Sequence, residues 1–308
     1  MARWPDLFVG SSLPVLCYHN VGGNGVPRVL FRRQMAWLAG QGYRTLGLSE
    51  LAAILAGHRP IGRAVLLTFD DGFRDLFTFI GPVLAGHGFT GLTFVITDRL
   101  RPEGEPGLDG EIIADQAHTD FIDRGERSAW LSAEELKKLT AQGLFEAGSH
   151  TARHAMRPLG PARPGPVPGH WAYGPWRGAM SAPELAPELA GPLWRAADGR
   201  PETVQEFYER AVETLTQSRR ELASVTGTEV ASLAWPWGRY HPLAVEAARQ
   251  AGFELVFSLA RGPLVPGADA CRLPRLEVRR GRGMGWFVSR LMIYGNARLA
   301  RWYSAGRM

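Results

Sequence analysis

The 308-residue chain is poor in cysteine and contains no long uninterrupted apolar run. Its two cysteines, Cys17 and Cys271, are too few and too far apart for a disulfide framework or a zinc knuckle, so we interpret both as buried filler. No stretch approaches the length of a membrane span, and the N-terminus lacks the basic start, apolar core and cleavage site of a signal peptide. We therefore expect a cytoplasmic protein.

Charge is distributed unevenly, although its net value is only +5. Residues 272–308 contain nine arginines and one acid, a net charge of +8, whereas residues 1–271 carry a net charge of −3. An apolar content of 45% is ample for a sizeable core and excludes disorder of the whole chain. The basic character therefore belongs to the tail.

Strand-like runs alternate with helix-like segments over most of the chain. We expect strands at 13–19, 64–69, 91–97, 144–148, 230–235 and 254–258, and helices at 31–41, 73–87, 132–142, 203–225 and 242–251. This alternation predicts parallel βαβ units within one α/β domain, residues 13–280, without an interdomain linker. A short lead, residues 1–12, precedes this domain, and the basic segment 281–308 follows it.

Two long segments, 98–130 and 157–200, interrupt the alternation, and the second is dense in proline, glycine and tryptophan. Loops of this length without clear periodicity are usually functional or disordered. In a barrel of parallel strands both would leave from the C-terminal strand ends, where sites are built. We expect these insertions to wall a substrate cleft.

Two adjacent carboxylates, Asp70 and Asp71, follow an apolar run at the predicted end of a strand, and His150 and His154 follow another such run. Histidines four residues apart share one face of a helical turn and reach one ion. A catalytic zinc takes three such ligands and keeps a position for water. Asp71 and the two histidines match that count, and Asp70, pointing another way, is suited to accept a proton from that water.

Each half of this pattern has an ordinary structural alternative. The aspartate pair is also typical of a helix cap or turn, and the histidine pair of a solvated helix. Their joint occurrence at strand ends favours the metal site. The remaining histidines other than His19 lack comparable partners, and we interpret them as surface or packing residues: His58, His87, His118, His170 and His241.

These motifs resemble a known family. Residues 68–72 (Thr-Phe-Asp-Asp-Gly) and 150–154 (His-Thr-Ala-Arg-His) resemble the first two signatures of the polysaccharide deacetylases, carbohydrate esterase family 4 with its NodB homology domain. Residues 234–238 (Ala-Trp-Pro-Trp-Gly) are similar to the segment that lines the family's groove. Residues 14–19 and 273–278 are similar to the branch acting on poly-N-acetylglucosamine. The likeness covers most of residues 13–278, without the insertions and the tail.

The resemblance implies a distorted (β/α) barrel of about seven parallel strands. It also implies hydrolysis of an N-acetyl group from an amino sugar in a polysaccharide or a lipid-linked glycan. A divalent metal, usually zinc, would be held by Asp71, His150 and His154, with Asp70 as general base. Arg275 would lie against Asp70 and help keep it ionised, since a neighbouring cation favours the charged form.

The resemblance further implies that the backbone N–H of Trp237 helps to hold the oxyanion, with Trp235 and Pro236 in the substrate groove. In the commonest branch of the family the general acid is a histidine late in the chain. This chain departs from that pattern, because no histidine follows His241. The branch with a Tyr-His opening places its acid there, so His19 is the candidate. The alternative for His19 is a core-edge residue bonded to backbone.

Segment 286–303 winds as a helix with arginines on one side and apolar residues on another. Two alternatives stay open: the apolar side packs on the barrel, or the segment contacts an anionic inner membrane, where a lipid-linked sugar would be found. Nucleic acid is not expected as a partner, because no nucleic-acid-binding motif is present.

Two other functions of the whole chain also stay open: a non-catalytic glycan-binding module with a relic metal site, and a metal hydrolase of a formyl or cyclic imide group.

Overall fold

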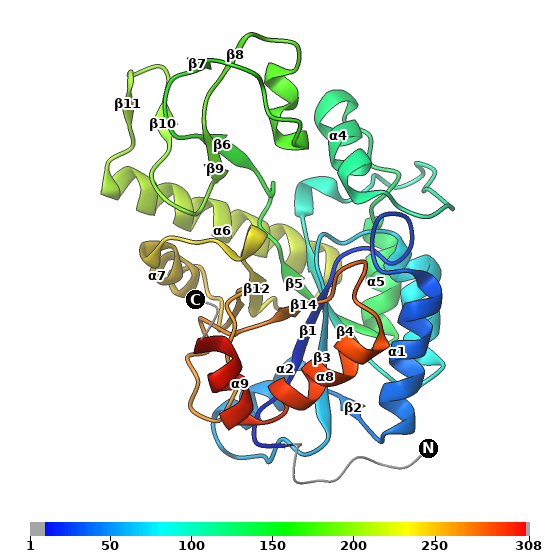
Figure 1. The fold of residues 1–308 in the computed structure, drawn as a ribbon. Coiled ribbons are helices and arrows are strands. Elements are labelled where there is room, and N and C mark those ends of the chain that lie inside the picture. Colours follow the sequence, from blue (N-terminus) through cyan, green and yellow to red (C-terminus); the bar gives the residue numbers. More distant parts are fainter. Residues whose placement is uncertain (1–9, 306–308) are drawn as a thin grey trace.

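Parallel strands form one curved sheet in the computed structural model, which describes residues 10–305 (Figure 1). Seven strands follow the order β13-β12-β5-β4-β3-β1-β14, and the short β2 pairs with β3. The strands are β1 (Val15–Tyr18), β2 (Arg44–Thr45), β3 (Ala64–Phe69), β4 (Gly91–Val95), β5 (Phe145–Ser149), β12 (Ser232–Ala234), β13 (Leu255–Phe257) and β14 (Leu276–Glu277). The predicted class, α/β with parallel strands, is confirmed.

Helices connect the strands. They are α1 (Arg28–Gly40), α2 (Leu48–Leu55), α3 (Gly81–Ala85), α4 (Ala114–Arg124), α5 (Ala133–Ala141), α6 (Val204–Thr226), α7 (Pro242–Gln250), α8 (Met284–Tyr294) and α9 (Ala297–Ala305). A capping box opens α5, because Glu135 N–H donates to Ser132 Oγ at 3.1 Å and Ser132 N–H donates to the Glu135 carboxylate at 3.0 Å. The predicted helix 73–87 is instead a π-helical turn, η2 (Leu76–Ile80), followed by α3. Pro82 has no N–H with which to continue an α-helical ladder.

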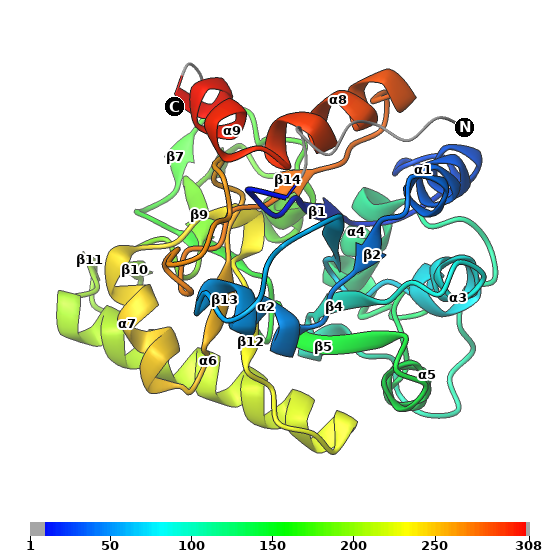
Figure 2. The ribbon, with the colours of Figure 1, turned by 90° about the horizontal axis from the view of Figure 1, so that it is seen from below.

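The sheet curls into a distorted barrel that an irregular segment closes. Phe257 in β13 forms a parallel bridge with Leu273, just before β14, and Leu273 N–H donates to Val256 O at 2.8 Å. Figure 2 shows α1, α3, α5, α6 and α7 on the outside of the strands. The predicted barrel of about seven strands is thus confirmed, with its distortion where β13 and β14 fail to pair directly.

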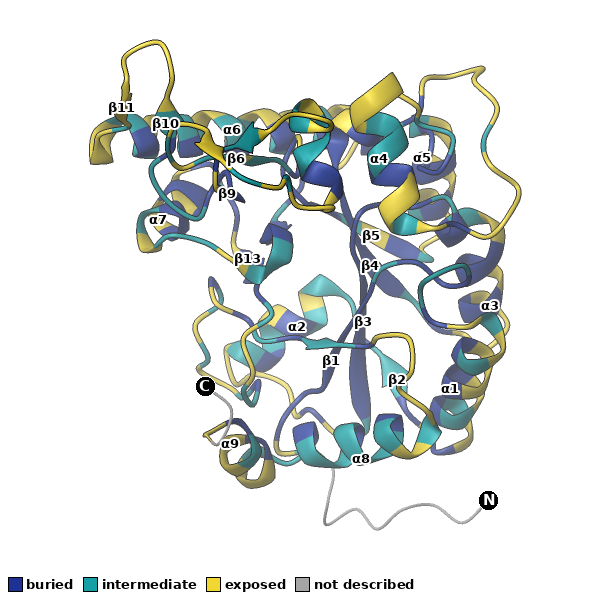
Figure 3. Cartoon of the chain, turned by 45° about the horizontal axis from the view of Figure 1, so that its top comes forward, coloured by how far each residue is buried: buried dark blue, intermediate teal, exposed yellow. Residues whose placement is uncertain are grey.

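Strand β3 is buried on both faces and illustrates how the core is divided. Val65 and Leu67 belong to the apolar cluster beneath the outer helices, whereas Ala64 and Leu66 belong to the cluster inside the barrel. Because side chains alternate along a strand, one continuous apolar run fills both layers. Figure 3 shows β3 as wholly buried. This is why the sequence predicts the limits of β3 correctly.

Both insertions lie at the end of the barrel where β1 and β3 terminate (Figure 1). The first, expected to lack regular structure, contains α4, which buries only Ala117 and His118 and therefore has too little apolar surface to produce a helical pattern. The second forms three short antiparallel pairs and one 3-10 segment: β6 (Met156–Pro158) with β9 (Leu185–Pro187), β7 (Arg163–Pro164) with β8 (Ser181–Ala182), β10 (Trp194–Arg195) with β11 (Arg200–Pro201), and η4 (Trp171–Trp176).

The C-terminal segment forms two helices, so the prediction of one continuous helix is wrong. The break falls at Gly295 and Asn296, where the Asn296 side chain accepts the N–H groups of residues 298 and 299 at 3.0 and 3.1 Å and starts α9. Helix α8 packs on the barrel, with Phe287 against Trp37 of α1 at a centroid distance of 6.3 Å. Trp302 on α9 is 78% exposed. Within residues 10–305, no helix combines the length and apolar character that crossing a bilayer requires.

Candidate metal centre

Four of the predicted site residues lie just beyond the C-terminal ends of parallel strands of the sheet. Asp70 and Asp71 follow β3, His150 follows β5, and His19 follows β1. Left-handed backbone is concentrated here, because the described non-glycine residues with positive φ are Asp71, Thr151, His154 and Trp237. Such conformations cost of order 1–3 kcal/mol each and cluster at functional sites.

His150 and His154 do not share a helix, and that part of the prediction is wrong. The chain turns through Thr151, whose φ is 64°, and the Thr151 hydroxyl accepts the N–H of His154 at 3.0 Å. His154 itself has a φ of 48°. Two left-handed residues cannot continue a right-handed helix. The loop still brings the two imidazole rings together, with centroids 4.8 Å apart.

Three donor atoms meet at the buried end of the site. Asp71 Oδ1 lies 3.6 Å from Nε2 of His150 and 3.8 Å from Nε2 of His154. This oxygen is buried and has no hydrogen-bond partner among residues 10–305, which is costly unless a cation binds there. His150 Nδ1 lies 2.9 Å from the carbonyl oxygen of Ala234, which places the ring proton on Nδ1 and leaves Nε2 free as a ligand. The three side chains therefore fit a divalent ion.

The protonation states of these side chains match that role. Burial lowers the pKa of His150, and burial together with the nearby His150 lowers the pKa of His154 well below its usual value. Burial alone would raise the pKa of Asp71, but His118, His154 and His19 outweigh it and hold that pKa well below the usual range. A carboxylate and two neutral imidazoles are the forms that coordinate a metal.

Asp70 forms a two-point contact with Arg275, as expected. Arg275 donates to Asp70 Oδ1 at 2.6 Å and to Oδ2 at 2.8 Å, and both side chains are buried. Burial would raise the pKa of Asp70, but the charge and hydrogen bonds of Arg275, together with the nearby His150 and His19, outweigh it, so the pKa is lowered. Cys17 places its Sγ 3.4 Å from Asp70 Oδ2, and burial raises the pKa of this thiol well above its usual value. Cys17 is therefore a neutral neighbour of the carboxylate.

His118 on α4 is a site residue that the sequence analysis missed. Its Nε2 lies 3.8 Å from Asp71 Oδ2, and its ring stacks on Trp171 at a centroid distance of 4.5 Å. The buried Arg99 places a guanidinium nitrogen 3.0 Å from His118 Nδ1. Because arginine only donates, Nδ1 accepts and the ring proton lies on Nε2, facing Asp71. His118 is therefore not a surface residue, and besides packing on Trp171 it faces the carboxylate of Asp71.

No local motif marks His118, because it belongs to the first insertion and reaches the site only when α4 folds over the strand ends. Histidine outside a recognisable spacing carries little sequence signal. Only the buried neighbours identify its role, namely Asp71 on one ring nitrogen and Arg99 on the other.

The sequence of residues 58–256 matches the family model described as polysaccharide deacetylase. The chain belongs to the polysaccharide deacetylase family. The match covers β3 to β12 and includes both the aspartate pair and the histidine pair. The family expected from the motifs is confirmed.

Among curated relatives, this family member is similar to poly-β-1,6-N-acetyl-D-glucosamine N-deacetylase of Escherichia coli K12, with 20% identity over 262 residues. The alignment covers 85% of this chain and 34% of the relative, so the chain spans about a third of the length of that protein. Two solved structures share its fold. A de-N-acetylase from Aggregatibacter actinomycetemcomitans has a TM-score of 0.71 and 20% identity, covering 91% of this chain and 100% of that one. IcaB from Ammonifex degensii has a TM-score of 0.63 and 24% identity, covering 94% and 99%.

A cleft of about 510 Å³ opens beside Asp71 and His154 in this deacetylase-family domain. Each insertion contributes a wall, His118 from the first and Trp171 from the second. Trp237 stacks with Trp171 at a centroid distance of 5.9 Å and lies over His154 at 4.0 Å. Gly238, with a φ of 66°, lets this loop turn, since a Cβ there would lie 2.7 Å from the backbone nitrogen of Leu259.

Trp235 and Pro236 lie in the interior rather than in the cleft. Both are buried, Trp235 stacks on Tyr240 at 5.2 Å, and neither lines the cleft. They support the loop that presents Trp237, and the expectation of direct substrate contact is corrected accordingly. The physical reason is that the loop turns sharply at Trp237, whose φ is 55°, so its side chain faces outward while its predecessors pack inward.

His19 lies on the cleft wall with a side chain that is 34% exposed. Its Nδ1 lies 3.9 Å from Glu277 Oε1, and one of its ring nitrogens lies within 4.8 Å of an Asp70 oxygen. Among the residues that the structure describes, its ring has no hydrogen bond to backbone, which disfavours the alternative of a bonded core-edge residue.

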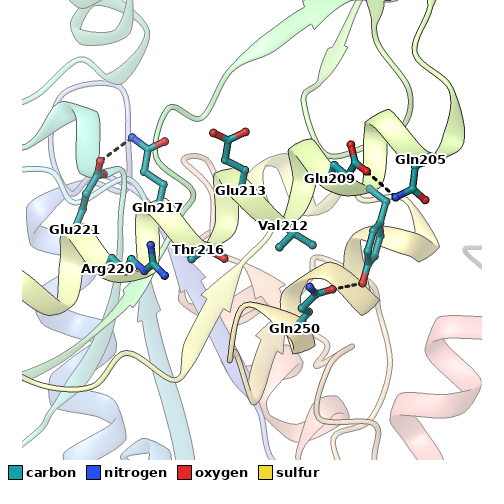
Figure 4. A pocket seen from close by; sticks show the side chains of 10 residues that line it. Gln205, Glu209, Val212, Glu213, Thr216, Gln217, Arg220, Glu221 and Gln250 are labelled. Carbon is teal, nitrogen blue, oxygen red and sulfur yellow. Dashed lines mark hydrogen bonds between the residues drawn. The ribbon is translucent and has the colours of Figure 1, made fainter.

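A hollow of about 730 Å³ runs along α6 and α7, away from the strand ends (Figure 4). Its polar side chains pair with one another, Gln205 with Glu209 at 2.8 Å and Gln217 with Glu221 at 2.8 Å. No histidine or cysteine lines it. We interpret this hollow as a solvated helix face, and the chemistry belongs to the cleft.

Proposed function

We propose that this chain is a metal-dependent deacetylase that hydrolyses the N-acetyl group of an amino sugar and releases acetate. The observation that carries the proposal is the approach of Asp71 Oδ1 to Nε2 of His150 and His154, at 3.6 and 3.8 Å, with Asp70 Oδ2 3.9 Å from the same His150 nitrogen. Family membership and the names of the relatives support the reaction class.

The metal is proposed to be zinc, held by Asp71, His150 and His154. One carboxylate and two imidazoles form a three-ligand set typical of catalytic zinc. When bound, such an ion polarises the acetyl carbonyl and lowers the pKa of a water molecule. The protein supplies ligands in their metal-binding protonation states and a buried, partly desolvated site.

Asp70 is proposed as the general base that accepts the proton of the attacking water. Arg275 holds its carboxylate by two hydrogen bonds, of 2.6 and 2.8 Å, which orient it and keep it ionised. The backbone N–H of Trp237 is proposed to donate to the oxyanion. His19 is proposed as the general acid that protonates the departing amine, a role supported by its partly exposed position on the cleft wall.

The substrate is proposed to be an N-acetylated glycan or a lipid-linked sugar, and a location at the inner membrane face stays a prediction. Support for a peripheral membrane contact comes from α9, where Trp302 is 78% exposed beside exposed Arg298 and Arg301. Co-sedimentation with anionic vesicles tests this part. We expect Trp302→Ser to reduce binding, and unchanged binding would remove α9 from the proposal.

Acetate release from a panel of N-acetylated sugars, with metal content measured on the same samples, tests the reaction. We expect release from at least one sugar, its loss after chelation, and its return when zinc is added. Release only from formylated or cyclic imide substrates would replace the proposal by hydrolysis of another amide. Glycan binding by the zinc-loaded protein without any hydrolysis would replace it by a binding module.

A further inference from the structure

A second cavity, of about 570 Å³, lies beside the cleft and is rich in arginine. We call it the arginine pocket and define it by six of its lining residues: Arg261, Arg279, Arg282, Trp286, Arg290 and Tyr303. Helices α8 and α9 supply one side of it, and Figure 2 shows these helices next to β14. Trp237, Leu259, Glu277 and Arg279 line both the arginine pocket and the cleft. One ligand can therefore extend from the metal centre into this pocket.

The positive charge of the pocket is largely uncompensated. Glu277 is the acid among its lining residues, and it pairs with Arg279. Arg261, Arg282 and Arg290 have no carboxylate partner within residues 10–305, in contrast to Arg275, which pairs with Asp70. Three guanidinium groups gathered around one cavity repel one another and create a positive potential that an anion relieves.

Aromatic rings hold two of these arginines without neutralising them. The guanidinium groups of Arg282 and Arg290 lie 5.8 and 5.5 Å from the Trp286 ring centroid, and Arg290 lies 4.5 Å from that of Tyr303. Stacking fixes the plane of a guanidinium but leaves its N–H groups available at the edge. Groups arranged in this way are suited to donate paired hydrogen bonds to a phosphoryl group.

The number of unpaired charges indicates the class of ligand. A phosphate monoester carries about −1.5 to −2 at neutral pH, whereas a sugar carboxylate carries −1. Three uncompensated guanidinium groups therefore match a phosphate or diphosphate better than a single carboxylate. Because the pocket shares walls with the cleft, one molecule can present both the anion and the acetylated amine.

Resting on the deacetylase function proposed above, we propose that the arginine pocket binds the phosphoryl group of an N-acetylamino sugar that is carried as a phosphate or diphosphate ester. The ester arises from one of three sources: a free sugar 1-phosphate, a nucleotide diphosphate sugar or a polyprenyl diphosphate sugar. All three present the same phosphoryl chemistry to Arg261, Arg282 and Arg290.

Steady-state acetate release by the zinc-loaded full chain tests the pocket. The substrates are a neutral N-acetylglucosamine trimer, N-acetylglucosamine 1-phosphate, its uridine diphosphate form and its polyprenyl diphosphate form. We expect Arg261→Gln, Arg282→Gln and Arg290→Gln in one chain to raise KM for at least one phosphorylated substrate about 100-fold, with kcat/KM for the neutral trimer unchanged within about twofold. Arg33→Gln, an exposed arginine of α1 outside both the arginine pocket and the cleft, is the matched control and should change neither.

Equal losses on the neutral and phosphorylated substrates would indicate structural damage and overturn the proposal, as would an unchanged KM for every phosphorylated substrate. The phosphorylated substrate with the lowest KM identifies the source. Calorimetric titration with inorganic phosphate separates this proposal from the deacetylase function. Phosphate binding that weakens at least about tenfold in the triple variant would support the pocket even if no substrate released acetate. If the chain releases acetate but the triple variant binds phosphate as tightly as the natural chain, the deacetylase function is supported and the proposed role of the arginine pocket is overturned.

Discussion

The metal centre and the arginine pocket share walls of one cleft but balance their charges in opposite ways. At the metal centre the charged groups are buried and face opposite or ligand-forming partners, as Asp70 does with Arg275 at 2.6 Å. In the arginine pocket, Arg261 and Arg282 are exposed and have no carboxylate partner within residues 10–305.

The difference follows from the cost of desolvation. A charge that is buried during folding costs several kcal/mol unless a partner is built in, so the catalytic end has to be neutralised by the protein itself. An exposed guanidinium group remains solvated by water, so it needs no partner within the protein and stays available to bind a ligand. We infer that the chemistry belongs to the buried end of the cleft and that recognition of charge belongs to its open end.

The largest effect should come from breaking the buried pair at the metal centre. In Asp70→Asn we expect kcat to fall at least about 10³-fold, because the proposed general base is lost, while bound metal is retained. The rate of acetate release measures kcat, and the metal content of the purified variant measures the retention of bound metal. His150→Ala is the companion variant and should lose metal and activity together. Full activity in a folded Asp70→Asn variant would contradict the proposed base.

Asp75 is a buried carboxyl group that, unlike Asp70, forms no ion pair with an arginine among the described residues. It therefore tests the cost of burying a charge without a partner. It is buried, accepts the N–H of Val21 at 2.6 Å, and burial raises its pKa to about 7. Because the folded state keeps this proton to a higher pH than the unfolded chain, the stability contributed by protonated Asp75 is present at acid pH and lost as pH rises through about 7.

We therefore expect Asp75→Asn to gain stability relative to the natural chain as pH rises from about 4.5 to 7.5, by about 3 kcal/mol. Denaturant unfolding at a series of pH values measures the difference. The same difference in unfolding free energy at every pH would show that Asp75 does not carry the proton.

The next effect should come from His19, the partly exposed side chain on the wall of the cleft. We expect His19→Ala to lower kcat about 100-fold and to lose the decline of the rate on the alkaline side, because that decline reports loss of the acid's proton. A pH–rate profile of both proteins provides the measurement. An alkaline decline that persists in the variant would exclude His19 as the acid.

A smaller effect is expected where His118 faces Asp71. His118→Phe keeps an aromatic ring against Trp171 but removes the N–H directed at Asp71. We expect the affinity for zinc to fall about 10-fold, as is typical of groups that orient a metal ligand. Competition with a chromogenic chelator measures the affinity without reference to turnover. Unchanged affinity would reduce His118 to a packing residue.

Much of this site could be predicted from the sequence, because the patterns that indicate it span only a few residues. The limits of β3 and the aspartates that follow it come from one continuous apolar run ended by two charges, and the capping box of α5 comes from residues three apart. The contact of Arg275 with Asp70 was expected only through family resemblance, since 205 residues separate them.

Other features depended on contacts that no local pattern encodes. The loop after β5 uses left-handed Thr151 and His154 instead of a helix, and Trp235 packs inward while Trp237 faces the cleft. His118 became a neighbour of Asp71 only through the folding of α4 over the strand ends.

By itself, the sequence determined the parallel α/β class, the two motifs that place Asp71, His150 and His154 in the candidate metal centre, and the concentration of arginine in the C-terminal segment. Only the tertiary structure decided that Arg99 and His118 stand behind Asp71, and that α8 and α9 gather arginines beside the cleft instead of forming one helix. The reason is physical. Apolar periodicity and capping act over a few residues, whereas the pairing or isolation of a charge depends on which distant segments meet when the barrel closes.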